Sequence, residues 1–175
     1  MDQTKIKKNP AFLEYVYQLN AGRDLSEAFQ HSLKAIDAID VAKFNRIGFQ
    51  TYQPGKWTLH TILQHLIDWE RIWCFRAVIF ARAEGTIPVA HDQEIMGANS
   101  NANELSIEQL QEELRIVRQS TMLLFASFNA KILATNCHFF EYEMPLHSIG
   151  LTITAHQIHH LNVIEERYFP LDVVV

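Results

Sequence analysis

The chain has few of the residues that break or cross-link regular structure. Its 175 residues include only six glycines, five prolines and two cysteines. This scarcity of turn-forming residues favours long helices over a turn-rich β fold. Cys74 and Cys137 lie far apart and lack the spacing of a cysteine metal site, which disfavours a disulfide framework. We therefore expect a reducing compartment, the cytoplasm.

Two other features are missing, an excess of basic residues and a long hydrophobic run. The net charge is −5 and no basic stripe offsets it, so nucleic-acid binding is not expected. The first ten residues contain no apolar signal core, and no apolar run is long enough to span a bilayer. A hydrophobic content of 48% with 20% charged residues is typical of a globular domain.

Hydrophobic periodicity predicts four long helices, at about residues 24–44, 57–83, 106–128 and 147–168. Thr58 is a candidate N-cap, and Ser106 with Gln109 fits a capping box. A shorter amphipathic piece precedes them at 11–19, a short helical turn is expected within 89–105, and a brief extended segment is expected near 139–142. The pattern predicts an all-α four-helix bundle, with 1–175 as one domain and 1–23 as an N-terminal extension packed on the bundle.

Three histidines are candidate metal ligands. His156 and His160 are four residues apart, so their side chains lie on the same face of the last helix. That face is otherwise apolar, and His65 shares an apolar face of the 57–83 helix. Inward imidazoles must be hydrogen-bonded or metal-bound, because an unsatisfied buried polar group is costly. A three-histidine metal site is the favoured hypothesis, and three core histidines with ordinary hydrogen bonds are the alternative.

The remaining histidines lack a partner at metal-ligand spacing. His159 points away from the axis of the pair and is expected to flank it, while His60 lies about 140° from His65 around its helix. His31, His138 and His147 are expected in the surface or the core. The chain has no H-E-x-x-H signature, so the metal hypothesis depends on helical spacing alone.

Several short runs, taken together, resemble the DinB-like superfamily. They are Pro54-Gly55-Lys56-Trp57-Thr58, His65-Leu66-Ile67-Asp68-Trp69-Glu70-Arg71, Arg76-Ala77, Asp92-Gln93-Glu94 and His156-Gln157-Ile158-His159-His160-Leu161. They occur in the family's order over about residues 24–168. Members include metal-dependent hydrolases of the YfiT type and thiol-dependent S-transferases.

The resemblance implies an up-down-down-up bundle with a divalent ion held by His65, His156 and His160. It also implies homodimers. Two positions depart from the family pattern: Ala155 stands where glycine is frequent, and His91 stands where an aromatic residue usually precedes Asp-Gln. The first departure is expected to be harmless, whereas His91 could alter the pocket wall or add an imidazole near the ion.

Three imidazoles leave a divalent ion with open positions, the pattern of a catalytic site, and all-nitrogen ligation suits zinc or nickel. The resemblance favours a thiol-dependent S-transferase that uses a low-molecular-weight thiol on small electrophiles. The alternatives are a hydrolase that uses metal-bound hydroxide, a non-catalytic metal-binding stress-response module, and a metal-free helical dimerisation domain.

Asp68, Arg76 and His91 are the candidate pocket residues beside the ligands. Arg76 lies eleven residues after His65, on nearly the same helix face. It could hold an anionic group of a substrate or thiol, or form an ion pair with Asp92 or Glu94. Asp68 could orient a neighbouring group or water. The adjacent pair Cys137-His138 lacks a third orienting group, so a cysteine nucleophile is disfavoured.

Overall fold

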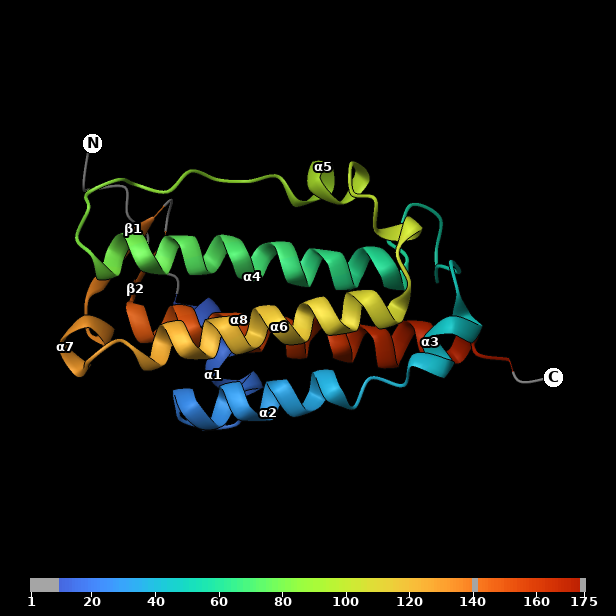
Figure 1. Cartoon of the computed structure of the whole chain (residues 1–175), viewed down its shortest axis with the longest axis horizontal. Coiled ribbons are helices and arrows are strands. Elements are labelled where there is room, and N and C mark those ends of the chain that lie inside the picture. The colour runs from blue at the N-terminus through green and yellow to red at the C-terminus, as the bar shows by residue number, and fades with distance from the viewer. Residues whose placement is uncertain (1–9, 140–141, 174–175) are drawn as a thin grey trace.

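Four long helices form the body of the protein in the computed structural model, which describes residues 10–139 and 142–173. They are α2 (Leu25–Asp37), α4 (Leu59–Ala81), α6 (Ile107–Ala126) and α8 (Leu146–Val163). In Figure 1, α2 and α8 run in one direction while α4 and α6 run in the other. The predicted four-helix bundle with up-down-down-up topology is therefore confirmed.

Side-chain caps fix the beginnings of three of these helices. The Asp24 side chain accepts from the backbone N–H of Glu27 in a capping box that begins α2. Thr58 caps α4, and Ser106 forms the expected capping box with Gln109 at the start of α6. These caps satisfy backbone N–H groups that have no partner within the helix.

The prediction of one helix from residue 24 to 44 is wrong, because the chain breaks after α2 and begins a separate helix, α3 (Val41–Ile47). The Asp40 side chain accepts from the backbone N–H of Lys43 and caps α3. An aspartate within a periodic apolar pattern can thus start a new helix instead of continuing the old one.

Shorter elements precede the four long helices or connect them. They are α1 (Pro10–Leu19), α5 (Gln93–Ala98), a 3-10 turn (Ala102–Glu104), α7 (Ala130–Leu133), β1 (Asn136–Phe139) and β2 (Tyr142–Pro145). The strands pair antiparallel with Cys137 opposite Met144. The extended segment expected near 139–142 meets the end of β1 at Phe139 and the start of β2 at Tyr142, and its residues 140–141 lie outside the described residues. After α8 the chain continues as a π-helical turn (Ile164–Tyr168) and a 3-10 turn (Phe169–Leu171).

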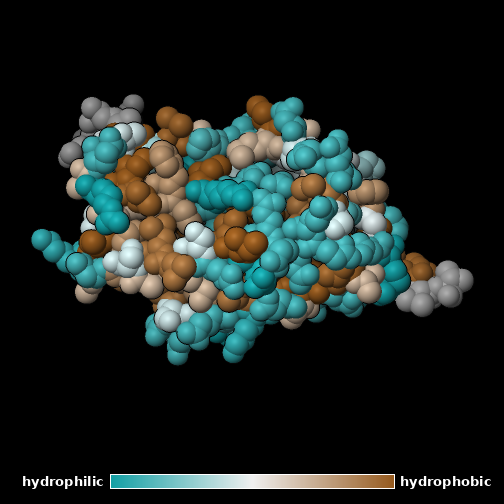
Figure 2. Space-filling model, viewed as in Figure 1, coloured by the Kyte–Doolittle hydropathy of each residue, from teal (hydrophilic) through white to brown (hydrophobic). Residues whose placement is uncertain are grey.

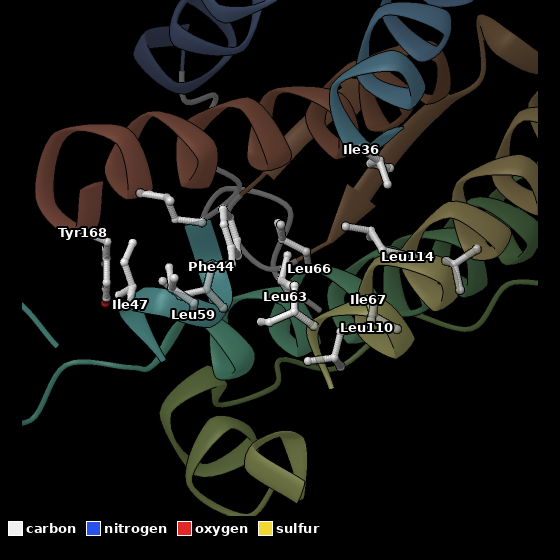
Figure 3. Close-up of a cluster of buried hydrophobic side chains, with 14 residues drawn as sticks. Ile36, Phe44, Ile47, Leu59, Leu63, Leu66, Ile67, Leu110, Leu114 and Tyr168 are labelled. Atoms are coloured by element: carbon white, nitrogen blue, oxygen red, sulfur yellow. The ribbon is translucent and has the colours of Figure 1, made fainter. Parts of the chain in front are cut away.

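The apolar core is divided between the two ends of the bundle. Figure 3 shows one cluster, in which Leu59, Leu63 and Leu66 of α4 pack with Leu110 and Leu114 of α6. The other cluster contains Trp73 and Ala77 farther along α4, and Ile149 and Ile153 of α8. On α8, His156 and His160 lie between Ile153 of the second cluster and Ile164 of the first, whereas His65 lies among the α4 residues of the first cluster. Apolar packing therefore holds this part of the two helices in place.

The outer face of α4 and α6 is mixed in character. In Figure 2, brown surface on this face is interrupted by teal, hydrophilic residues. Phe75 and Val78 of α4 and Ile116 and Leu123 of α6 are exposed. Homodimer formation stays a prediction. Among the described residues, no helix combines the length and apolar character needed to cross a bilayer.

Candidate metal centre

His65, His156 and His160 meet between α4 and α8. The Nε2 atom of His156 lies 3.0 Å from Nε2 of His65 and 3.1 Å from Nε2 of His160. Within the described residues, the three form a group whose nitrogens, one from each ring, all lie within 4.8 Å of one another. The structure therefore brings together the same three histidines that helix spacing and the family resemblance select.

Aromatic rings hold His65 in its orientation. The His65 ring centroid lies 4.8 Å from that of Trp57 and 5.0 Å from that of Trp69. Only 5% of His65 is exposed. With its ring packed between two indoles, the imidazole has little freedom to turn its Nε2 atom away from His156.

Burial keeps the three imidazoles neutral. Loss of hydration lowers the pKa of His65 to about 4. It also lowers the pKa of His160 to about 3, with smaller contributions from His65 and His159. The pKa of His156 falls well below its ordinary value, first through burial and then through the neighbouring imidazoles. At neutral pH all three rings therefore offer a lone pair, which metal binding requires.

Hydrogen bonding alone does not satisfy this arrangement. The Nε2 atom of a neutral imidazole carries either one proton or one lone pair. Nε2 of His156 faces two other Nε2 atoms, so it can make one good hydrogen bond but not two. A cation in the middle would use all three lone pairs. Tetrahedral zinc with bonds of about 2.05 Å requires ligand nitrogens about 3.3 Å apart, close to the 3.0 Å and 3.1 Å that separate Nε2 of His156 from its two neighbours. The donor set therefore fits a divalent ion.

A cavity of about 470 Å³ opens beside the cluster. His156 forms part of its wall, next to Ala155 and His159 of α8 and across from Trp69 and Trp73 of α4. Cavities of about 300–1,000 Å³ hold small-molecule ligands in other proteins. The histidine cluster is thus in contact with a space large enough for a substrate.

The three candidate pocket residues occupy different places. Arg76 and His91 line the cavity, whereas Asp68 lines a small recess beside His65. The Asp68 side chain accepts a hydrogen bond of 2.9 Å from Gln64, and burial raises its pKa. Burial lowers the pKa of Arg76, whose guanidinium lies 4.7 Å from the Trp73 ring centroid.

The ion pair that Arg76 was expected to form with Asp92 or Glu94 is absent among the described residues. Asp92 instead accepts from the backbone N–H groups of Glu94 and Ile95 and caps α5. Arg76 donates from Nη2 to the carbonyl oxygen of Val89, 3.3 Å away. This bond connects α4 to the segment that carries His91.

The other histidines lie outside the cluster, as their spacing predicts. His60 is buried against Phe49, with ring centroids 4.8 Å apart. His31 and His138 are exposed. His147 is half-buried. His159 flanks the cluster, with its ring centroid 5.2 Å from that of His160.

Neither cysteine is a candidate nucleophile. Burial raises the pKa of Cys74 to about 11 and that of Cys137 to about 12. Both thiols are therefore protonated at neutral pH, and a thiolate is the nucleophilic form. A sulfur nucleophile would have to come from outside the protein.

Two features of the site are not among the sequence predictions. The phenol oxygen of Tyr15 lies 2.8 Å from Nδ1 of His159, which joins α1 to the edge of the cluster. In a recess that His156 also lines, the Arg118 guanidinium donates two hydrogen bonds of 2.8 Å to the Glu70 carboxylate. Each feature has a signal in the sequence. An apolar and aromatic stripe at residues 12, 15, 16 and 19 indicates that α1 packs on the bundle, and charged residues at the inward positions 70 and 118 indicate a buried ion pair.

Comparison with known proteins places this geometry in context. The sequence model of the DinB superfamily matches residues 24–164. No curated protein sequence matches the chain. A solved structure, YfiT from Bacillus subtilis, superposes with a TM-score of 0.60 over 88% of this chain and 85% of that chain, at 15% sequence identity. YfiT is described as a probable metal-dependent hydrolase with an unusual four-helix bundle topology.

Proposed function

The chain belongs to the DinB superfamily, and from that premise and the histidine cluster we propose that it is a metal-dependent enzyme acting on small molecules. The observation that carries the proposal is the convergence of three neutral imidazoles in a cluster of which one member, His156, lines a substrate-sized cavity. His65, His156 and His160 would hold a divalent ion, with zinc or nickel suited to three imidazoles. When bound, the ion supplies a Lewis acid that lowers the pKa of a coordinated nucleophile.

The reaction proposed first is thiol-dependent S-transfer to a small electrophile. The sulfur–carbon bond forms while the leaving group departs with its electron pair, and the thiol proton passes to solvent. The two cysteines of the chain are held protonated by burial, so the thiol is a low-molecular-weight cosubstrate. The family resemblance supports this reaction, and the size of the cavity is compatible with it.

Hydrolysis is the second candidate, and the likeness in fold to YfiT favours it. Water would then take the place of the thiol as nucleophile. Asp68 lines the same recess as His65, and burial raises the pKa of its carboxyl above the ordinary value, the direction that suits a group that accepts and returns a proton. Arg76 and His91 would contact the substrate in the cavity under either reaction.

Metal content and turnover test the proposal together. Purified full-length protein should contain about one divalent ion per chain by mass spectrometry, or take up one on titration with zinc or nickel. His160→Ala should weaken metal binding by more than the roughly 10- to 100-fold typical of changes around metal ligands. His31→Ala, which removes an exposed histidine of α2, is the matched control and should leave metal binding unchanged.

Loaded protein should then be assayed with 1-chloro-2,4-dinitrobenzene and a panel of low-molecular-weight thiols, and separately with 4-nitrophenyl esters. Turnover that requires a thiol supports S-transfer, and ester cleavage without thiol supports hydrolysis. Activity that survives both chelation and His160→Ala would contradict a metal mechanism. Failure of zinc and nickel to bind would leave the three residues as core histidines.

A further inference from the structure

Helix α1 forms one wall of the cavity beside the histidine cluster. Its lining residues recur at i, i+3, i+4 and i+7, which places them on one helix face. Helices α4 and α8 line the cavity with similar stripes. The lining residues of the three helices are Phe12, Tyr15, Val16 and Leu19 of α1, Trp69, Trp73 and Arg76 of α4, and Thr152, Ala155, His156 and His159 of α8. The cavity is thus bordered by three helices and the segment that contains Ala90 and His91.

Polar contacts hold α1 against α8. At the end of α1, the buried Asn20 donates from Nδ2 to the carbonyl oxygen of Leu151 at 3.0 Å and accepts from Oγ1 of Thr154 at 2.7 Å. The hydroxyls of Tyr17 and Ser148 lie 3.1 Å apart. With the Tyr15–His159 contact, these links join the two helices along the length of α1. The helix is therefore a fixed wall, and its side chains define the shape of the cavity.

The described lining of the cavity differs in charge from the chain as a whole. The chain has a net charge of −5, yet none of the described lining residues is an aspartate or a glutamate. Arg76 is the cationic lining residue, and it is 3% exposed. Most of the remaining lining is aromatic or aliphatic. Such a wall favours a ligand with an apolar body and one negative charge.

We propose that the cavity binds a small amphipathic carboxylate, with its apolar body against α1 and its carboxylate at Arg76. This inference names the substrate class of the proposed enzyme and rests on that proposed function for its catalytic meaning. Phe12 and Val16 set the length and width of the body that fits. Because α1 precedes the family match at 24–164, this selection is made by residues outside the family-matched segment.

The charge preference is tested by calorimetric titration of the full-length protein with 4-phenylbutyrate and with its neutral analogue 4-phenylbutan-1-ol. The acid should bind at least about tenfold more tightly, the range expected for a charge-assisted hydrogen bond. Arg76→Gln should remove this difference while leaving the affinity for the alcohol unchanged. Equal affinity of wild-type protein for the two ligands, or no binding of either, would overturn the inference.

The role of α1 is tested by changing the size of its wall. Phe12→Ala should shift the preference from 4-phenylbutyrate toward 6-phenylhexanoate by about tenfold, because two more methylenes find buried space. Phe75→Ala, at an exposed residue of α4 outside the lining, is the matched control and should cause no shift. An unchanged preference in Phe12→Ala would refute the assignment of α1.

A second variant does not depend on the packing of α1. Ala90 is an exposed lining residue, so Ala90→Phe should fill part of the cavity and weaken 4-phenylbutyrate binding without disturbing the core. Ala126→Phe on α6 adds the same bulk at an exposed position outside the lining. If both variants bind the acid as wild type does, the ligand occupies another site and the inference fails.

Zinc titration of the same preparations separates the two proposals. Zinc binding without selective binding of the acid would overturn the cavity inference and leave the metal-dependent function standing. Selective binding of the acid without zinc or nickel binding would overturn the metal-dependent function and leave the cavity inference standing. Dependence of acid binding on both Arg76 and α1, in protein that also takes up zinc, supports both.

Discussion

The buried pair of Glu70 and Arg118 allows a quantitative prediction. Glu70 on α4 and Arg118 on α6 form two parallel hydrogen bonds of 2.8 Å, and their side chains are 2% and 1% exposed. Removing one member of such a pair leaves the other charge buried without its partner. Arg118→Met should therefore lower the free energy of unfolding by about 3–5 kcal/mol.

A matched control is present on the same helix. Arg115 forms a similarly short bidentate pair with Glu112, at 2.7 Å, but the two side chains are 36% and 53% exposed. Solvent screens an exposed pair and leaves it a contribution of at most about 1 kcal/mol. Arg115→Met should thus have a small effect, even though the substitution and the hydrogen-bond geometry are the same.

The assay is urea unfolding followed by circular dichroism, with wild type and both variants at pH 7. The double variant Glu70→Leu/Arg118→Met should regain most of the stability lost by Arg118→Met, because it removes both charges and restores apolar packing. A loss below about 1 kcal/mol in Arg118→Met would refute the reasoning. So would a double variant no more stable than the single one, since the cost would then come from packing.

Two further predictions follow from burial and packing. Burial lowers the pKa of His65 from 6.5 to about 4, so the unfolded chain binds more protons between these values and stability falls as the pH decreases. In metal-free protein, His65 should lower the free energy of unfolding at pH 5 by about 2 kcal/mol relative to pH 7. Urea unfolding of wild type and His65→Gln at both pH values measures this contribution, which should be absent in the variant. Gly150→Ala should cost about 1–3 kcal/mol instead of stabilising α8, because the new Cβ would lie 2.6 Å from Cδ1 of Leu25 and 3.0 Å from Cε1 of Phe125. Urea unfolding measures this effect, and a more stable Gly150→Ala would contradict it.

The proposed S-transfer and hydrolysis share one set of residues and differ in the nucleophile. Both need the neutral imidazoles of the cluster and the adjoining cavity. Burial raises the pKa values of the cysteines to about 11 and about 12, which disfavours a sulfur nucleophile from the protein at neutral pH. The distinction therefore depends on which small molecule reaches the cluster, and the thiol-dependence assay measures that directly.

Local patterns in the sequence are sufficient to predict most of the helices and the faces of the ligand candidates. Thr58 and Ser106 cap helices because a side-chain oxygen beside a free backbone N–H acts over a few residues. His156 and His160 share a face because of the 3.6-residue period, whatever the rest of the chain does. The same local reasoning was insufficient at Asp40, where capping ended one helical pattern and began another.

Contacts between helices depended on the tertiary structure. Periodicity tells which side of α4 is buried but not which helix covers it, so the 3.0 Å approach of His65 to His156 followed only from packing. The pairing of Glu70 with Arg118 and the closure of the cavity by α1 have the same origin. These groups are distant in sequence, and their meeting is set by how four amphipathic faces rotate and slide against one another to bury their apolar surface.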